Sequence, residues 1–318
     1  MSPRRCIILN PRSGRGRAAK LRPQLERELH AAGIACDIVP TAAPGDAVRL
    51  ARLLCQQGYE QLYVMGGDGT INEVLTGIFS VAGDLDHSPL PEPPAALGFI
   101  PIGTGNDFVR SLPDVRANHI ASAVQRMHTA ATRRIDVGRV RVTSLTATGT
   151  TTRPYLFLNN LALGIDAIVA DKVGTLHLLD GLPAYLAASL LALLTFTPHS
   201  LRLHADAVQL ERPLLLASVT NGQYQGGGFR LTPDAVLDDG LLDLCLVEPM
   251  RTDQALRALP HAVRGTHARL PQVQLLQAQQ IHVSFSVPHT VVTDGEVISR
   301  TAVQVHAENM ASALRIIG

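Results

Sequence analysis

The first 135 residues alternate short apolar runs with segments whose apolar positions recur every three to four residues. The runs show little alternation with polar residues, which is typical of strands buried on both faces of a parallel sheet. The segments between them have the spacing of amphipathic helices. This βαβαβα order predicts a doubly wound α/β domain, in which ligands bind at the carboxyl ends of the strands. The predicted strands are residues 6–9, 34–39, 61–64 and 97–100, and the predicted helices are residues 17–30, 46–57, 72–79 and 118–127.

From residue 135 onward, the pattern changes to short strand candidates separated by turn residues. Two helix candidates, residues 183–197 and 252–259, interrupt them. A threonine-rich stretch at residues 143–152 is predicted to be a hairpin loop. We therefore expect a second domain that is mostly antiparallel β. Its predicted strands are residues 135–142, 155–161, 201–203, 214–219, 241–247, 281–285 and 290–292.

Composition and charge limit the partners that the chain can use. With 28 Lys and Arg against 27 Asp and Glu, the net charge of the 318 residues is +1, which argues against binding of nucleic acid or membranes through overall charge. The four cysteines are widely spaced and form no metal-binding motif, so we expect reduced thiols. The N-terminus has only a four-residue apolar run, too short for a signal peptide. These features predict a cytoplasmic protein that binds no nucleic acid.

One stretch, residues 181–201, contains no Asp, Glu, Lys or Arg. A membrane-spanning helix needs about 20 mainly apolar residues, whereas Pro183 and Pro198 bracket only 14 here. We therefore expect a buried or interfacial helix over residues 183–197. Two interpretations stay open: the helix lines an acyl-chain groove or rests on a bilayer surface, or it is an amphipathic core helix.

Three glycine-rich loops each follow a predicted strand of the first domain and precede a helix. At such a position, exposed backbone N–H groups and the helix dipole favour anions. Glycines allow the backbone to approach a phosphate closely. Because the carboxyl ends of parallel strands lie at one edge of a sheet, we expect the three loops to face the same crevice. The loops are NPRSGRG (10–16), GGDGTINE (66–73) and PIGTGNDF (101–108).

Single loops also have other interpretations. The segment GRGRAA (14–19) has the GxGxxA spacing of a dinucleotide-binding loop, with Asp37 as a ribose ligand. Against it, the glycines stand away from the strand end and Asp37 falls inside its predicted strand. GGDG alone also occurs in ordinary tight turns. The spacing GxxxxGK[ST] is absent from the sequence, which excludes a P-loop nucleotide site.

Together the loops are far more specific, and the chain resembles the diacylglycerol kinase catalytic-domain superfamily, which includes bacterial lipid kinases related to diacylglycerol, sphingosine and ceramide kinases. The resemblance spans nearly the whole chain, with its motifs in the expected order. The matching segments are NPRSGRG (10–16), VMGGDGTINEVLTGI (64–78), GFIPIGTGNDFVRSL (98–112), NGQYQGGGFRLTPDAVLDDGLLDL (221–244) and TDGEV (293–297).

The resemblance implies an N-terminal three-layer, Rossmann-like α/β domain that binds ATP and a C-terminal β-sandwich, as in NAD kinases and diacylglycerol kinases, with the active site in the cleft between them. It also implies that the chain end returns to the first domain. The expected domains are therefore residues 1–134, completed by 307–318, and residues 135–306, which would hold a structural Mg²⁺ and the acceptor lipid.

The resemblance also implies which residues bind the cofactors ATP and Mg²⁺. Asp68 would act through the Mg²⁺ of the nucleotide, and Asp107 would shape the site. The structural Mg²⁺ would be bound by Asp239 and by the carbonyls of Val236 and Leu241. The residues expected around ATP are Asn10, Pro11, Ser13, Gly14, Thr41, Gly66, Gly67, Asp68, Gly69, Thr70, Asn72, Glu73, Gly103, Thr104, Asn106 and Asp107.

Phosphoryl transfer to an alcohol also requires a base for the hydroxyl proton. The segment Asp294-Gly295-Glu296 follows a predicted strand and places two carboxylates on a tight turn. The resemblance implies that this DGE motif supplies the base, and the sequence does not decide between Asp294 and Glu296. A plain turn with solvated acids is the alternative.

The expected activity is transfer of the γ-phosphate of ATP to a hydroxyl of diacylglycerol or a similar lipid. No residue separates diacylglycerol, sphingoid, ceramide and phosphatidylglycerol as acceptors, and transient contact with the inner membrane surface and a homodimer are left open. One departure from the relatives is Arg15, where they commonly carry lysine. Arginine keeps the positive charge, but its planar guanidinium differs in shape and reach from the lysine ammonium group. The alternatives are an NAD kinase, which also uses a GGDGT loop, and a non-catalytic nucleotide or lipid sensor.

Overall fold

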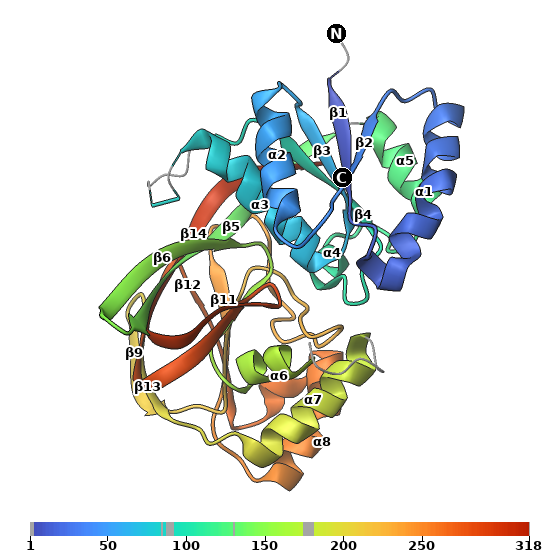
Figure 1. The fold of residues 1–318 in the computed structure, drawn as a ribbon. Helices are drawn as coiled ribbons and strands as arrows, with labels where there is room; N and C mark the ends of the chain where they lie inside the picture. Colours follow the sequence, from blue (N-terminus) through green and yellow to red (C-terminus); the bar gives the residue numbers. More distant parts are fainter. Residues whose placement is uncertain (1–2, 84, 87–91, 130, 174–180, 318) are drawn as a thin grey trace. The chain divides into compact units, whose positions relative to one another are not determined.

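The computed structural model describes residues 3–83, 85–86, 92–129, 131–173 and 181–317, and it divides the chain into two compact units (Figure 1). Unit 1 comprises Met1–Ile135 with Ser312–Gly318, and unit 2 comprises Asp136–Ala311. The chain therefore passes from one unit to the other twice, in strands β5 and β14.

Unit 1 contains a parallel sheet in the order β2-β1-β3-β4, extended by the last residues of β14, where Ile316 is paired with Leu97. Every residue of β3 and β4 is buried, which explains why these strands are apolar without alternation. The strands are β1 (Arg5–Leu9), β2 (Asp37–Pro40), β3 (Gln61–Gly66), β4 (Ala96–Pro101) and β14 (Glu296–Ile317).

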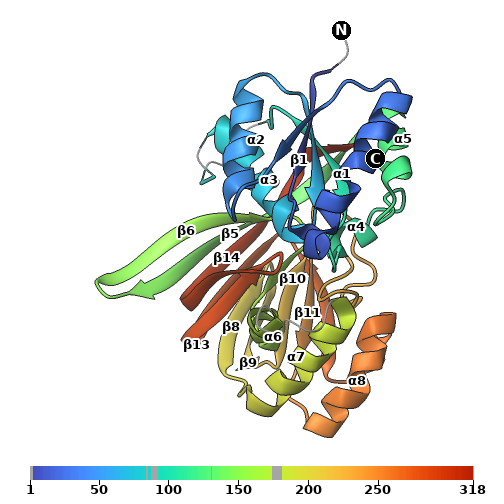
Figure 2. The same cartoon turned by 45° about the vertical axis from the view of Figure 1, so that its right-hand side comes forward.

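Helices cover both faces of this sheet (Figure 2). On one face, α1 and α5 pack through Leu25, Leu29 and Met127 onto the side chains of β1, β3 and β4. On the other face lie α2 and α3, which pack closely because Gly77 of α3 has no side chain: a Cβ there would lie 2.5 Å from the Val48 carbonyl oxygen. The predicted three-layer α/β domain is therefore confirmed. The helices are α1 (Ser13–Ala31), α2 (Asp46–Gln56), α3 (Asp68–Ala82), α4 (Asp107–Arg110) and α5 (Ile120–Thr129).

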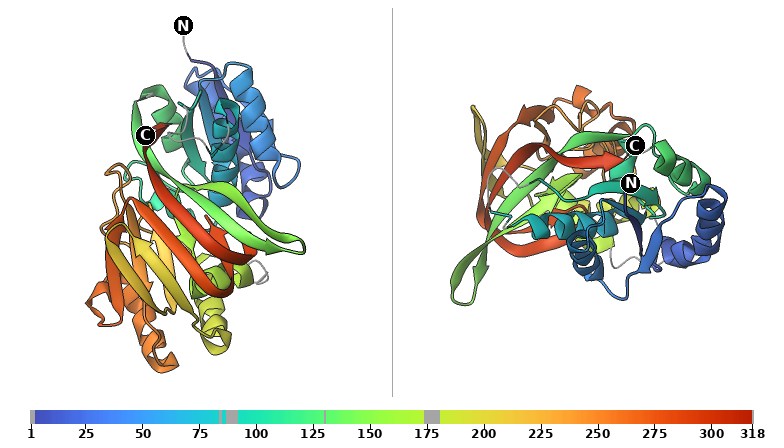
Figure 3. Two further views of the ribbon diagram at one scale, coloured as in Figure 1. Left: turned by 90° about the vertical axis from the view of Figure 1, so that its left-hand side faces the viewer. Right: turned by 90° about the horizontal axis from the view of Figure 1, so that it is seen from above.

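Unit 2 is built from antiparallel strands in the order β12-β11-β10-β7-β13-β14, with β5, β6, β8 and β9 attached (Figure 3). Strand β13 pairs with β8 through residues 281–285 and with β7 through residues 292–293, and the register of β13 against β14 shifts between these stretches. The strands are β5 (Thr132–Thr146), β6 (Gly149–Phe157), β7 (Asn160–Ala162), β8 (Ser200–Ala205), β9 (Val208–Pro213), β10 (Leu216–Thr220), β11 (Leu242–Val247), β12 (Val273–Ala278) and β13 (Gln280–Thr293).

The two faces of β11 show how the core of unit 2 is divided. Leu244 and Leu246 point into the core formed by the strands, whereas Cys245 and Val247 contact the helices on the other face. This alternation is the period of two that a strand imposes on its side chains. The helices are α6 (Ile165–Val173), α7 (Gly181–Thr195), α8 (Thr252–Arg264) and the 3₁₀ helix η1 (His267–Arg269).

Two predictions for unit 2 need correction. The threonine-rich stretch 143–152 is not a loop: β5 continues to Thr146 and β6 begins at Gly149, so that Thr143 pairs with Thr152. Threonine is β-branched and favours strands, which explains the error. Strands β9 and β12 were also missed. Strand β9 is partly exposed along its whole length, so it lacks the apolar run that marks a buried strand.

Candidate active site

The first loop follows β1 and begins with Asn10, which connects two neighbouring strands. Its backbone N–H donates to the Met65 carbonyl oxygen at 3.0 Å, and its side-chain Nδ2 donates to Thr70 Oγ1 at 3.0 Å. Its Oδ1 accepts the Arg12 N–H at 3.0 Å, which shapes the turn into α1. Asn10 therefore joins the first loop to the second.

Within this loop, three consecutive residues adopt the left-handed conformation: Gly14, Arg15 and Gly16, with φ of 59°, 57° and 82°. Gly14 is also held close to the third loop, because a Cβ there would lie 2.4 Å from the Ile102 carbonyl oxygen. The contact with the Ile102 carbonyl oxygen requires glycine at position 14, and the positive φ favours it. Arg15 is exposed on this turn.

The second and third loops touch through their glycine backbones. A Cβ on Gly103 would lie 2.6 Å from the Gly67 Cα, and a Cβ on Gly67 would lie 3.1 Å from the Gly103 Cα. The Gly66 carbonyl oxygen accepts the N–H groups of Ile102 and Gly103 at 2.9 and 3.2 Å. The three loops therefore form one connected cradle at the carboxyl ends of β1, β3 and β4, as the sequence predicts.

Asp68 is the first residue of α3, and its carboxylate lies at the start of α4. It accepts the N–H groups of Asp107 at 3.2 Å and Phe108 at 3.3 Å. Burial raises the pKa of the Asp68 carboxyl, while these amide donors lower it. Asp68 therefore fixes the third loop against the second, in addition to any role toward a bound ion.

Asn106 and Asp107 precede and begin α4. Asn106 is left-handed and buried, and its Nδ2 donates to the Gly103 carbonyl oxygen at 2.8 Å. Within the described part of the chain, Asn106 Oδ1 is buried without a hydrogen-bond donor. Asp107 is buried and its carboxylate lies 3.9 Å from the Arg110 guanidinium. Thr104 is exposed at the tip of the loop.

Glu73 has a structural partner that the sequence did not indicate. Its two carboxylate oxygens accept the N–H groups of Gly45 at 2.9 Å and Ala47 at 3.1 Å, at the start of α2. Thr41 lies just before this turn and donates its N–H to the Leu9 carbonyl oxygen at 2.8 Å. Glu73 thus positions the segment that contains Thr41. The remaining expected ligands are half-buried beside the loops: Pro11, Ser13, Gly69 and Asn72.

The dinucleotide interpretation of the first loop receives no support from Asp37. The Asp37 carboxylate accepts a hydrogen bond from the Tyr59 hydroxyl, and β2 begins at this residue. A carboxylate that binds a ribose would instead follow the strand.

In unit 2, the DGE motif forms the two-residue turn between β13 and β14. Asp294 and Gly295 are both left-handed, with φ of 47° and 87°, and Thr293 pairs with Glu296 across the turn. Such a turn matches the twist of the flanking strands. The turn therefore fixes the two carboxylates of the motif in different environments.

Asp294 is buried and accepts three backbone hydrogen bonds, from the N–H groups of Leu158, Asn159 and Asn160 at 2.8 to 2.9 Å. Glu296 is exposed at the start of β14. The structure thus separates two carboxylates that the sequence leaves equivalent. Asp294 orders the chain that leads into β7, while Glu296 is accessible.

Sequence reasoning did not find three buried asparagines beside this turn. Asn159 Nδ2 donates to the Tyr224 carbonyl oxygen at 2.7 Å, which ties the turn to the glycine loop 226–228. Asn221 Nδ2 donates to the carbonyl oxygens of Asp136 and Leu158. Asn160 pairs with Thr220 between β7 and β10. An Asn-Asn pair inside an apolar run was the available signal, since buried amides are retained where they organise backbone.

The expected structural metal loop surrounds Asp239. Asp239 Oδ1 accepts the Leu241 N–H at 3.0 Å, and the Leu241 carbonyl oxygen accepts Asn309 Nδ2 at 2.8 Å. Asp136 also contacts this loop, because its Oδ2 accepts the Gly240 N–H at 2.7 Å. Val236 lies exposed at the beginning of the loop.

The donor chemistry of this loop fits a hard divalent ion, because it offers a carboxylate beside backbone carbonyls. Nearby, burial and, to a smaller extent, the charges of Asp239 and Asp234 raise the pKa of Asp243 to about 6. Across the described residues, no three His, Cys, Asp or Glu side chains are grouped to hold a metal. An ion at this loop would therefore depend on the carbonyls.

Two family profiles match the chain and together cover most of it. The diacylglycerol kinase catalytic domain matches residues 4–140, and the YegS C-terminal NAD kinase beta sandwich-like domain matches residues 159–318. A diacylglycerol kinase from Staphylococcus saprophyticus is 31% identical over 300 residues, 93% of this chain and 90% of that protein. The chain belongs to the diacylglycerol kinase family. It is therefore a kinase, a phosphotransferase with an alcohol group as acceptor.

Other members of this family and its structural neighbours agree in length and fold. A diacylglycerol kinase from Bacillus subtilis is 29% identical over 291 residues, 91% of this chain and 88% of that protein. The crystal structure of a diacylglycerol kinase from Bacillus anthracis superposes with a TM-score of 0.67 at 21% identity, covering 99% of this chain and 96% of that one. Yeast NADH kinase complexed with NADH superposes at 0.51 with 9% identity, covering 100% and 84%. The last two likenesses concern the fold alone.

Proposed function

We propose that this chain transfers the γ-phosphate of ATP to a hydroxyl of diacylglycerol or a similar lipid in a reaction that requires Mg²⁺. The connected cradle of three glycine loops is the observation that carries the proposal. The Gly67 and Gly103 backbones touch where any Cβ would intrude, so the loops present main chain instead of side chains at the strand ends. Main-chain N–H groups at helix starts are what a triphosphate requires.

The residues of unit 1 fit a nucleotide with a bound ion. Asn10, Gly14 and Thr41 would surround the phosphates and the ribose, together with the residues of the second and third loops. Asp68 would hold the ion, and the buried Asn106 Oδ1 without a donor is a polar atom that a ligand could satisfy. ATP with Mg²⁺ supplies the transferable phosphoryl group and neutralises its charge.

In unit 2, Glu296 would accept the proton of the lipid hydroxyl as its oxygen attacks phosphorus. A general base must be accessible to the substrate, and Glu296 is exposed while Asp294 is buried and accepts three amide hydrogen bonds. Asp294 would position the turn. The loop around Asp239 would bind a structural Mg²⁺ that holds residues 236–241.

A transfer assay tests this function. The purified protein receives γ-labelled ATP and Mg²⁺ with diacylglycerol, monoacylglycerol, phosphatidylglycerol, sphingosine, ceramide or NAD, with the lipids in mixed micelles. Label on a lipid supports the proposal and identifies the acceptor. Label on NAD alone would assign an NAD kinase, and ATP binding without label on any acceptor would favour a nucleotide or lipid sensor.

The base is tested with Glu296→Gln, which removes the proton acceptor and keeps the shape. We expect kcat to fall by at least about a hundredfold with ATP affinity unchanged. The matched control is Glu211→Gln, another exposed glutamate in unit 2, which should keep full activity. Equal activity of the two variants would refute the assignment of Glu296.

A further inference from the structure

Helix α7 buries three alanines and exposes three leucines. Ala184, Ala188 and Ala192 are at most 1% exposed, whereas Leu190, Leu191 and Leu194 are 44%, 47% and 67% exposed. At 100° per residue, Leu190 and Leu194 lie about 200° and about 240° around the helix from Ala188, so they face away from the core. Leu182, Leu186 and Leu193 of the same helix pack against the core. Packing within unit 2 therefore leaves Leu190, Leu191 and Leu194 as the exposed leucines of α7.

The buried alanines let α7 lie close against its neighbours. Ala188 and Ala192 pack with Ile165 and Val169 of α6. No residue of the stretch 181–201 carries a formal charge, so no charged side chain of α7 itself shields the exposed leucines. Over the described part of the chain, no helix is both long and apolar enough to cross a membrane.

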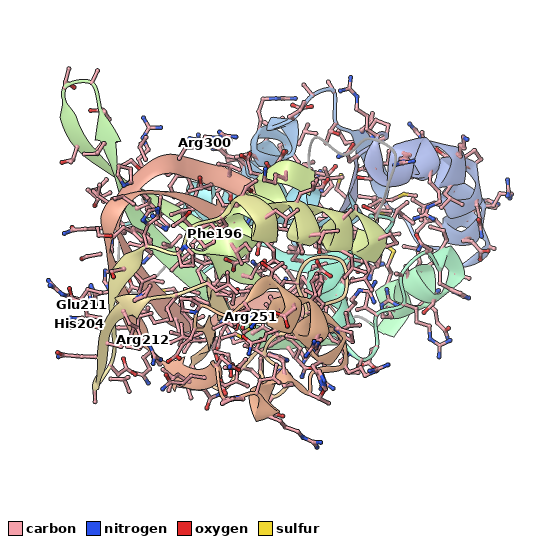
Figure 4. All side chains as sticks on the ribbon, turned by 90° about the horizontal axis from the view of Figure 1, so that it is seen from below. Phe196, His204, Glu211, Arg212, Arg251 and Arg300 are labelled. Atoms are coloured by element: carbon pink, nitrogen blue, oxygen red, sulfur yellow. The ribbon has the colours of Figure 1, made fainter. Side chains whose placement is uncertain are left out.

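Helix α8 lies beside α7 and continues the apolar face. Leu186 of α7 packs in one cluster with Leu259 and Val263 of α8. Leu256, which is 39% exposed, lies about 20° around α8 from Val263, so it borders this cluster on the outside. Figure 4 shows the two helices side by side, with Phe196 just after α7 and Arg251 at the beginning of α8. We call Leu190, Leu191, Leu194 and Leu256 the leucine face.

Positive charge gathers on α8 next to this face. Residues 251–269 contain four arginines and one aspartate, a formal charge of +3 in a chain whose net charge is +1. Arg251 and Arg257 are about four-fifths exposed and share the one acid, Asp253, at 3.0 and 3.5 Å. Arg257 and Arg264 are seven residues apart and so project from the same side of α8. An apolar face bordered by arginines is complementary to an anionic bilayer surface.

We propose that the leucine face and the arginines of α8 dock unit 2 onto the surface of an anionic lipid bilayer. The leucines would enter the boundary between headgroups and acyl chains, and the arginines would contact lipid phosphates. The inference rests on the proposed lipid kinase function for its choice of a lipid as the occupant, and it names the surface on which the enzyme would meet its substrate.

Vesicle sedimentation tests the leucine face. The full chain is mixed with vesicles of equimolar phosphatidylglycerol and phosphatidylcholine, or of phosphatidylcholine alone, and bound protein is measured. We expect the anionic vesicles to bind the wild type, and the triple variant Leu190→Gln, Leu191→Gln, Leu194→Gln to bind at least about tenfold more weakly. The matched control is Leu145→Gln, Val208→Gln, Val287→Gln, which changes three other exposed apolar residues of unit 2 and should bind as the wild type.

A second pair of variants tests the charge. Arg257→Gln with Arg264→Gln should weaken binding to anionic vesicles and reduce its dependence on salt. Arg153→Gln with Arg202→Gln, two other exposed arginines of unit 2, should change neither. The single variant Leu194→Gln covers the case in which the triple variant fails to fold, and it should bind about twofold to fivefold more weakly.

Each outcome decides the proposal. Unchanged vesicle binding by the leucine variants, or no binding of anionic vesicles by the wild type, would overturn it. A leucine variant that instead converts a dimer to a monomer in size-exclusion chromatography would show that a second copy covers this face. Phosphorylation of a short-chain diacylglycerol in detergent micelles is measured in parallel. Vesicle binding without phosphorylation would refute diacylglycerol as the acceptor and leave the docking surface, whereas phosphorylation without vesicle binding would refute the docking surface and leave the proposed transfer to diacylglycerol.

Discussion

Replacing Asp294 by asparagine tests whether this residue organises the turn and is not the base. The three amide hydrogen bonds to its carboxylate, all between 2.8 and 2.9 Å, are buried. An asparagine side chain keeps one oxygen for Asn159 and Asn160 but turns an NH₂ group toward the Leu158 N–H. Its shape and its tolerance of the left-handed conformation leave the backbone unstrained.

The size of the effect follows from these contacts. A hydrogen bond to a charged group contributes about 1.5 to 3 kcal/mol and a neutral one about 0.5 to 1.5 kcal/mol, and a buried donor left unpaired costs about 1 to 3 kcal/mol. Weakening two bonds and losing the third therefore predicts a loss of about 3 to 5 kcal/mol in the free energy of unfolding.

Urea unfolding at neutral pH measures this loss, and hydrogen exchange of the amides of residues 158–160 locates it. The matched control is Asp206→Asn. Asp206 is also left-handed and accepts two backbone N–H groups, from Gln279 and Gln280, but it is exposed. Its replacement should cost about 1 kcal/mol or less because water can satisfy the amides. Equal losses for the two variants, or a stable Asp294→Asn protein that has lost only kcat, would refute the reasoning.

Three further predictions concern the loops, the metal and a buried acid. Gly103→Ala places a Cβ 2.6 Å from the Gly67 Cα, so we expect a loss of about 1 to 3 kcal/mol in urea unfolding and weaker ATP binding in calorimetry; unchanged ATP affinity would contradict the cradle. Added Mg²⁺ should raise the melting temperature of the wild type but not of Asp239→Ala, and an equal response would count against the loop as a metal site. Burial raises the pKa of Asp166 to about 7 from 3.8, so the folded state holds this proton more tightly. Stability should fall as pH rises from about 4 to 7, by an amount on the order of 4 kcal/mol. Asp166→Asn should flatten the stability profile over this range, and a slope like that of the wild type would contradict the assignment.

The α/β unit could be predicted well because each of its central strands has the same burial, and therefore the same apolar character, along its whole length. Strands such as β3 are buried at every residue, and the glycine loops stand where strands end, so apolar runs and turn residues coincide. Unit 2 was harder. Strand β9 is half-exposed, and the 22 residues of β14 pass through several environments, so neither has one dominant pattern.

The candidate site could likewise be predicted only in part from the sequence. Loop positions such as Gly67 and Gly103 follow from their motifs, but the contact between them depends on the order of strands in the sheet. The partner of Glu73 at the start of α2 and the amides around Asp294 join segments far apart in the sequence. The choice between Asp294 and Glu296 needs the pairing of β7 with β13, which no local pattern contains.

The contact of the glycine loops also limits how the proposed nucleotide site of this enzyme could be redesigned. Gly14, Gly67 and Gly103 touch backbone of another loop, so a side chain added at any of them would displace two loops at once. Mutational libraries at these positions should return mostly inactive protein. Diversity is better placed at Arg12 and Thr104, whose side chains are exposed beside the cradle. The backbone of the three loops would then keep its conformation, and the exposed side chains beside it would determine which nucleotide binds.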